Sequence, residues 1–285
     1  MPHLTRRGFT LVELLIALVL IGIVTAGLYR VLVNNQRIYS AQTQRIEMLQ
    51  NIRAAAAILP AELRELSASE GDIGAMSATS IQIRGMRQVA ILCETPVLGV
   101  RNPVLRIRQA PIYGLRAFDA SRDSILVYYE GDDAIRTDDG WVLGRITSIA
   151  AGVCPDTRPA WVLTTALSFG AGQSAVTGNI RGGAPARGFE PVRYSLYTSG
   201  GRPYIGLEEG TAAIQPVVGP LTTNGLSLAY FDSTGAGTAT PARVAMIRMT
   251  LRAETQQAFR QPNGAIARAV DSVTTWVALR NNLRY

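Results

Sequence analysis

The first residues that could take part in chemistry are a carboxylate and a pair of arginines at the front of a long apolar run. The segment Arg6–Phe9 precedes Glu13, and residues 14–29 carry no formal charge. An ionised acid inside a bilayer costs at least ~2.5–3.5 kcal/mol and is normally paired with a partner. We therefore expect Glu13 to have a functional role at the membrane and to need a nearby positive charge.

This arrangement resembles the leader of type IV prepilins and pseudopilins: a short basic stretch ending at Gly8, a hydrophobic segment beginning with Phe9, and Glu13 five residues in. The resemblance implies that a membrane peptidase cuts between Gly8 and Phe9 and that Phe9 becomes the N-methylated terminus. It also implies that Glu13 pairs with the terminal amine of a neighbouring subunit during assembly.

The physical chemistry of the segment agrees with this resemblance. Gly8 offers a peptidase a backbone without a side chain, and the two arginines hold the leader on the cytoplasmic face. Cleavage would create an amine in the same low-dielectric layer as Glu13. That amine is the positive charge that the carboxylate needs, and such a pair could set the register between subunits.

Two other kinds of membrane segment are alternative interpretations of this apolar run. An ordinary secretory signal has an apolar region of roughly 7–15 residues followed by a small-residue cleavage site. Here the run from Phe9 to Tyr29 covers ~31 Å, about one hydrocarbon core, and a helical pattern continues beyond it. A plain single-pass anchor with an accidental Glu13 is the other alternative.

Composition argues against catalysis. All 28 basic residues are Arg, and the single His, His3, lies in the leader. The mature chain would therefore lack His-dependent nucleophiles, Lys Schiff bases, the Lys of a phosphate-binding loop and His-containing zinc sites. A carboxylate pair of the glycosidase type is not excluded by composition, but no local pattern indicates one. We predict no enzyme activity, no cofactor and no metal site.

The positive charge is modest. Removal of Arg6 and Arg7 lowers the net charge from +7 to +5. Arginines recur along the chain, for example Arg101, Arg106, Arg108 and Arg116. We interpret them as a solvated Arg-rich face, and binding of DNA or an anionic surface is the less favoured alternative.

The two cysteines, Cys93 and Cys154, suggest a disulfide. An exported domain folds in an oxidising compartment, where an even number of cysteines often pair. The alternative is two buried thiols in different parts of a sheet. A bridge between them would contribute about 2–4 kcal/mol to stability.

The helical pattern continues well past the membrane segment. A mostly apolar stripe at spacings of three and four runs along Leu28, Leu32, Asn35, Tyr39, Gln42, Ile46, Leu49, Ile52, Ala56, Leu59, Leu63 and Leu66. A helix over residues 9–66 would be ~87 Å long, so we expect its upper half to pack on the rest of the chain. Pro60 should kink it or begin a new turn. A coiled-coil homodimer is the competing interpretation.

From Ser67 onward the sequence changes to short β-type runs separated by turns. Predicted strands are 80–84, 104–108, 124–129, 161–165, 192–197, 243–252 and 272–279. The last two should form an antiparallel pair joined by the turn-rich region 261–264. One long helix followed by an antiparallel sheet is an α+β arrangement, and it resembles the pilin fold.

Two segments between the strands read as loops. Residues 169–188 are rich in Gly, Ala and Ser and predict a flexible surface loop. Residues 130–140 form an acidic turn that includes Asp132 and Asp139. Oxygen ligands of this kind suit Ca²⁺, but the spacing does not match the EF-hand loop. We therefore favour a solvated hairpin over a calcium site.

Two later segments resemble one subgroup of the family. Residues 49–66 are similar to the upper helix of PilW-like minor pilins and of J-type pseudopilins of type II secretion, and residues 274–282 are similar to the final strand of the PilW-like group. Trp276 departs from that pattern. The size of the β-rich region also favours a minor subunit over a major pilin.

The sequence thus predicts a minor type IV pilin with a leader (1–8), a transmembrane half-helix (9–29), an exported half-helix (30–67) and a β-rich head (68–285). Its expected partners are the prepilin peptidase/N-methyltransferase, other minor and major pilins, and the inner membrane. The head would lie in the periplasm and later in the pilus. A type II secretion pseudopilin and a DNA- or surface-binding tip adhesin are the alternatives.

Overall fold

A computed structural model of the chain describes residues 10–98, 102–110, 113–114, 116–132, 134–135, 138–168, 180–261 and 264–280. The processing residues Gly8 and Phe9 lie outside this range.

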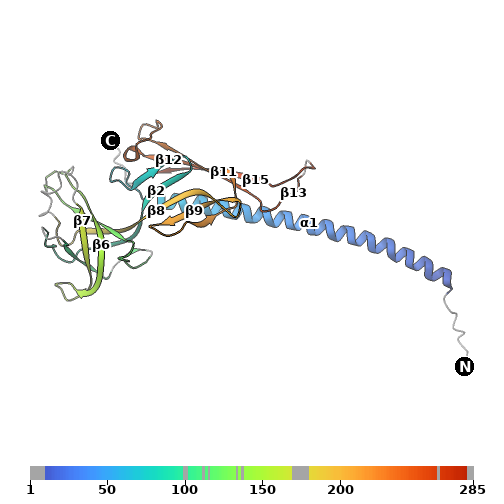
Figure 1. Cartoon of the computed structure of the whole chain (residues 1–285), viewed down its shortest axis with the longest axis horizontal. Coiled ribbons are helices and arrows are strands. Elements are labelled where there is room, and N and C mark those ends of the chain that lie inside the picture. The colour runs from blue at the N-terminus through green and yellow to red at the C-terminus, as the bar shows by residue number, and fades with distance from the viewer. Residues whose placement is uncertain are drawn as a thin grey trace, which may run out of the picture.

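One long helix, α1 (Leu11–Arg64), dominates the N-terminal part of the molecule. It extends as a rod away from a β-rich body, with the N-terminus at its far end (Figure 1). Thr10 caps its first turn, and Glu65 follows its last residue. The helix continues through Pro60, where the sequence suggested a kink or a new turn.

The rest of the described chain forms antiparallel strands and a short 3₁₀ turn, η2 (Pro241–Arg243). The strands are β1 (Ile73–Met76), β2 (Ser80–Ile91), β3 (Val104–Arg108), β4 (Tyr113–Gly114), β5 (Ser124–Tyr129), β6 (Gly140–Val153), β7 (Pro159–Ser168), β8 (Pro185–Ser199), β9 (Arg202–Glu209), β10 (Gln215–Val218), β11 (Leu221–Phe231), β12 (Met246–Glu254), β13 (Phe259–Arg260), β14 (Ile266–Ala267) and β15 (Val270–Ala278). This is the α+β, pilin-like class that the sequence predicts: one apolar helix packed on an antiparallel body.

The strands form three sheets. The largest has the order β1-β2-β8-β5-β6-β7-β3, with β9 and β10 continuing from β8 and with β4 on β2. A three-stranded sheet has the order β11-β12-β15, and β13 pairs with β14 in a small hairpin. The predicted final pair is confirmed, because β12 and β15 are antiparallel along nine residue pairs.

The body has two hydrophobic cores. In the proximal lobe, α1 packs on the three-stranded sheet, on β9 and β10, and on the parts of β2 and β8 around Ile83 and Val192. In the distal lobe, β3, β5, β6 and β7 enclose a separate core with the other parts of β2 and β8, around Ala90 and Ala186. The distal lobe lies at the end of the molecule opposite the N-terminus (Figure 1). The two long strands β2 and β8 therefore join the lobes.

The other predicted strands also occur, with some shifted bounds. The predicted strand 243–252 begins three residues later, at Met246, because Pro241–Arg243 forms η2. The predicted loop 169–188 is wrong at its end, where residues 185–188 belong to β8. Small side chains are needed there, since Ala186 is fully buried and a Cβ on Gly188 would collide with the Gln88 side chain.

Strand β11 was not among the predicted strands, and it contains a dipeptide that is typical of turns. Asn224-Gly225 is a common hairpin turn, but here it lies inside β11. The pairing of β11 with β12 shifts register between Leu221 and Leu226. A Cβ on Gly225 would collide with Leu221, so the glycine permits a bulge in a continuous strand.

Only the last part of the predicted helix stripe packs on the body. Its members Ile52, Leu59 and Leu63 are buried, together with the neighbouring Met48 and Ala55. In contrast, the stripe residues Leu28, Leu32, Tyr39 and Ile46 are all more than half exposed. The body thus buries side chains of α1 only from Met48 onward, further up the helix than the full stripe suggests.

Candidate functional site

The first turn of α1 is built around Thr10 and Glu13. The Glu13 backbone N–H donates to Thr10 Oγ1 at 3.3 Å, and Glu13 Oε2 accepts from the Thr10 N–H at 3.0 Å and from the Thr10 hydroxyl at 3.1 Å. This is a reciprocal capping box. Glu13 Oε1 accepts no hydrogen bond from any described residue. The carboxylate is therefore held through one of its two oxygens.

The helix that follows this cap is apolar and uncovered. Every residue from Thr10 to Leu32 is exposed in the isolated chain. Its main polar side chain, Thr25, donates to the carbonyl oxygens of Ile21 at 2.7 Å and Gly22 at 3.1 Å. The segment is long and apolar enough to cross a membrane, and the Thr25 hydroxyl is satisfied within the helix, as a bilayer requires.

A hairpin arm marks the lower limit of the head on α1. Arg45 donates to the Gln261 side-chain oxygen at 2.9 Å and lies over the Phe259 ring at 5.2 Å. The Gln257 N–H donates to the Gln44 side chain at 2.9 Å. Residues 10–32 and 34–40 of the chain are exposed, so the uncovered part of α1 is longer than a membrane requires.

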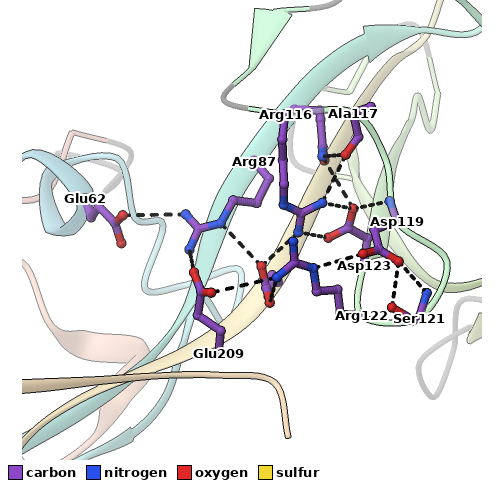
Figure 2. Close-up of polar contacts among 11 residues, drawn as sticks. Glu62, Arg87, Arg116, Ala117, Asp119, Ser121, Arg122, Asp123 and Glu209 are labelled. Carbon is purple, nitrogen blue, oxygen red and sulfur yellow. Dashed lines mark hydrogen bonds and ion pairs between the residues drawn. The ribbon is translucent and has the colours of Figure 1, made fainter. Parts of the chain in front are cut away.

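Three buried charged residues, Arg87, Asp123 and Glu190, lie at the junction of the two lobes. Figure 2 shows charged side chains converging there from several elements. We call them the junction ion network: Glu62, Arg87, Arg116, Asp119, Arg122, Asp123, Glu190 and Glu209. Arg87 is 6 % exposed and Glu190 is fully buried. The network is the point at which α1, β2, β8, β9 and the 116–123 loop meet.

Arg87 is the hub on the proximal side. Its guanidinium lies 3.5 Å from the Glu62 carboxylate on α1, 3.6 Å from Glu190 on β8 and 3.6 Å from Glu209 on β9. β2 shifts its register against β8 between Met86 and Gln88. Arg87 continues the inward alternation of Ile81, Ile83 and Gly85, and after the bulge Gln88 and Ala90 are the buried positions. A buried charge at this position needs partners, and the three carboxylates supply them.

Arg116 is the hub on the distal side. It binds both carboxylate oxygens of Asp123, at 2.7 and 2.6 Å, and reaches Glu190 at 2.8 Å. The hydrogen bonds to Asp123 raise the pKa of the Arg116 guanidinium. Glu190 therefore lies between Arg87 and Arg116, and it couples the two lobes through opposite charges.

Sequence reasoning missed this network. Its members come from positions 62 to 209 and share no spacing. One weak signal existed, because Arg87 and Glu190 interrupt otherwise β-type runs. Their partners could be found only after β2 and β8 were paired.

The two cysteines are joined in the structure. Cys93 and Cys154 form a disulfide with their Cα atoms 5.7 Å apart. Cys93 follows the end of β2, and Cys154 follows the end of β6. Ion pairs flank the bridge, between Arg106 and Glu94 at 3.4 Å and between Arg108 and Asp156 at 2.9 Å. The bridge ties the segment that leaves β2 to the end of β6.

The acidic turn uses its carboxylates on its own backbone. The Gly131 N–H donates to Asp139 at 3.0 Å, and the Asp132 N–H donates to Asp138 at 2.7 Å. Within the described ranges, which omit Asp133, no group of three His, Cys, Asp or Glu side chains is placed to hold a metal ion.

The arginines that suggested a solvated basic face are largely engaged in ion pairs. Arg106 and Arg108 pair with the acids beside the disulfide, and Arg116 belongs to the junction ion network. Arg101 lies outside the described residues. The interpretation as a solvated face is therefore wrong for Arg116, because buried Asp123 and Glu190 hold its guanidinium.

Comparison with known proteins gives one match, at the N-terminus. Residues 4–29 match the family model described as the prokaryotic N-terminal methylation motif. No curated protein and no solved structure matches the chain.

The motif and the free apolar helix coincide. Residues 11–29 of the matched segment form the exposed start of α1. Together they support a type IV pilin-like or pseudopilin subunit that is processed as a prepilin, assembles with other pilins and is anchored in the membrane by a single span. A subunit of this kind is typically structural.

Proposed function

We propose that this protein is a minor type IV pilin that is cleaved between Gly8 and Phe9, methylated on Phe9 and incorporated near the tip or initiation complex of a pilus. The observation that carries the proposal is the first turn of α1. There a Glu13 carboxylate, oriented by Thr10 through one oxygen, stands at the start of an uncovered apolar helix.

The mechanism is assembly. The apolar part of α1 first holds the subunit in the inner membrane and then packs against the helices of neighbouring subunits. Glu13 Oε1, which has no partner among the described residues, receives the terminal amine of a neighbour. An ion pair in a low-dielectric layer is strong only in good geometry, so it sets the axial position of each subunit.

The shape of the body supports a minor, terminal position. The distal lobe extends beyond the end of α1 that is opposite the N-terminus (Figure 1). A subunit stacked further along the same axis would meet this lobe. The lobe is easily accommodated at the end of a fibre and less easily inside a repeating lattice.

A pseudopilin of type II secretion would share all of these features. The genes next to this one distinguish the two systems, because secretion and pilus operons encode different machinery.

Mass spectrometry of the mature chain from the native host tests the proposal. We expect an N-methylated terminus at Phe9, and an intact leader or a cut elsewhere would refute the assembly mechanism. A Glu13→Ala chain should still be cleaved but be lost from sheared fibres. Glu47→Ala, which removes an exposed acid from the same helix, is the matched control. Normal incorporation of Glu13→Ala would refute the register role.

A further inference from the structure

The three-stranded sheet has one long open edge, formed by β15. The Leu279 N–H donates to Ala245 O and the Thr255 N–H donates to Ala269 O, both at 3.0 Å. In an antiparallel ladder alternate residues face the neighbouring strand, so the odd-numbered residues of β15 bond to β12. The backbone groups that point to the open edge belong to Val270, Ser272, Thr274, Trp276 and Ala278.

This edge lacks the usual protection. Exposed edges are normally blunted by Lys, Pro, bulges or short strands. β15 has nine residues, contains no Pro or Lys, and pairs with β12 without a register shift. Its one charge, Asp271, lies near its start. The Ser272 N–H donates to the Asp271 side chain at 2.7 Å. No described strand pairs with this edge, so from Thr274 to Ala278 it is a template for another strand.

A preformed aromatic cluster lies beside the edge. Trp276 is 49 % exposed, and its ring centroid is 5.2 Å from that of Phe231 on β11. The guanidinium of Arg248, on the strand between them, lies 5.4 Å from the Trp276 ring and 5.5 Å from the Phe231 ring. Trp and Arg dominate binding energy at protein interfaces. Here both side chains are already held in position.

The direction of β15 restricts the partner. At its end, the Arg280 N–H donates to Arg64 O on α1 at 2.9 Å. Before its start, the hairpin arm contacts Gln44 and Arg45 further down the helix. β15 therefore runs in the same direction as α1. Antiparallel pairing of two β15 strands would point their α1 helices in opposite directions, which two copies anchored in one membrane cannot do.

We propose that β15 accepts, in antiparallel pairing, a strand from a neighbouring pilin-like subunit of different sequence, and that Trp276 packs on that strand. The inference rests on the proposed function. A subunit whose helix packs on the free part of α1 brings its head alongside β15, because β15 lies along the same helix. Main-chain hydrogen bonds would then supply affinity, and the cluster around Trp276 would supply specificity.

Site-specific photo-cross-linking of the full chain in the native host tests this. Benzoylphenylalanine at Thr274 should cross-link to a strand of a second subunit that carries its own prepilin-type leader. Ser227 is the matched control. It lies in the same row of the sheet as Thr274 but on β11, which β12 separates from the β15 edge. A cross-link from position 274 to a second copy of this chain, or equal cross-linking from both positions, would overturn the proposal.

Two edge variants supply a second test. Thr274→Lys places a charge at the edge, and Thr274→Pro removes an N–H that the fold does not use. Both variants should abolish recovery of the complex between this chain and the neighbouring subunit. Thr250→Lys, on the paired central strand, should not. If Thr274→Pro lowers the thermal midpoint of the head, its loss of binding is not informative, and the result with Thr274→Lys is used instead. Recovery of the complex by Thr274→Lys would overturn the proposal.

The outcomes separate this inference from the proposed function. If the chain begins at Phe9 and enters fibres while position 274 cross-links to no other subunit, the edge proposal fails and the proposed function stands. If the leader is uncut but position 274 still cross-links to another membrane-anchored subunit, the proposed function fails and the edge proposal stands.

Discussion

The phenolic hydroxyl of Tyr194 on β8 donates a hydrogen bond to the Glu62 carboxylate near the end of α1, with 2.9 Å between the oxygens. Burial, and then the negative charge of Glu62, raise the pKa of Tyr194, so the phenol stays a neutral donor. This bond ties the helix to the strand that joins the two lobes.

Removing that hydroxyl should destabilise the protein measurably. Tyr194→Phe deletes a hydrogen bond to a charged acceptor, worth roughly 1.5–3 kcal/mol. We expect the low end of that range, because the Glu62 side chain is 26 % exposed and keeps Arg87 as a partner. Urea unfolding of the full chain in detergent measures the effect. Tyr197→Phe, on the same strand, is the control, and equal losses from both variants would contradict the prediction.

Arg87→Met should be among the most damaging single changes in the body. It removes the cation that faces Glu62, Glu190 and Glu209 and leaves a buried negative charge without one of its partners. Breaking a buried ion pair in this way costs about 3–5 kcal/mol. Chemical denaturation of the full chain provides the measurement.

Arg158→Met tests whether burial is the cause. The Arg158 side chain is 72 % exposed, and its nearest acid, Asp156, is 3.8 Å away. A surface pair contributes about 0–1 kcal/mol, so this variant should unfold close to the parent. If Arg87→Met also unfolds at nearly the same denaturant concentration as the parent, the junction ion network does not stabilise the junction of the lobes.

Loss of the Cys93–Cys154 bridge should weaken the distal lobe. The cysteines are 61 residues apart in sequence, and closing a loop of this size contributes about 4 kcal/mol in the chain-entropy model and typically 2–4 kcal/mol. A Cys93→Ser/Cys154→Ser double variant should lose this amount in urea unfolding. Reductant should destabilise the parent and leave the double variant unchanged. Sensitivity of both proteins to reductant would contradict the prediction.

Acid should weaken the turn that follows β11. Asp232 accepts hydrogen bonds from the Thr234 N–H at 2.9 Å, the Thr234 hydroxyl at 2.6 Å and the Ala236 N–H at 3.1 Å. The bond from the Thr234 hydroxyl is the main reason that the pKa of Asp232 is lowered from its usual 3.8. Its contribution to stability is therefore present above pH 3.8 and disappears as the pH falls through the lower folded value. Asp232→Asn should reduce the loss of thermal stability in that window.

The pH dependence that Asp72 contributes to stability has the opposite sign to that of Asp232. Burial raises its pKa above the usual 3.8, so the folded state binds its proton more readily than the unfolded state. Its contribution to stability should decrease as the pH rises through the folded value. Asp72→Asn should remove this trend, and the same direction of change in both variants would show that one assignment is wrong.

The sequence was informative where side-chain pattern and backbone structure coincide. The apolar run with Glu13 predicted the exposed helix, and alternating runs such as residues 80–84 and 104–108 predicted strands that occur. Prediction failed where tertiary packing overrode local signals. Ala186 and Gly188 fall in the predicted loop 169–188, but they belong to β8, where Ala186 is buried and Gly188 packs against Gln88.

The junction ion network could not be predicted for a different reason. Glu62, Arg87 and Glu190 are each ordinary in their local sequence, and their charges matter only after a helix and two strands meet. The helix stripe was overextended for a similar reason. A periodic pattern predicts an apolar face, but it does not say whether the same chain or a neighbour covers that face.

The joint between the lobes also bears on how such a protein changes over evolutionary time. The Leu92 N–H donates to Ala184 O at 3.0 Å, and the Gly183 N–H donates to Leu92 O at 2.8 Å. The segment between these residues is an insertion at the tip of the β2–β8 hairpin, and its strands β4 and β5 also pair with β2 and β8. Its strands β6 and β7 pair with neither β2 nor β8, so lineages can enlarge or replace them without altering α1 or β15. The outer surface could then diversify quickly while the parts proposed to serve assembly stay constant.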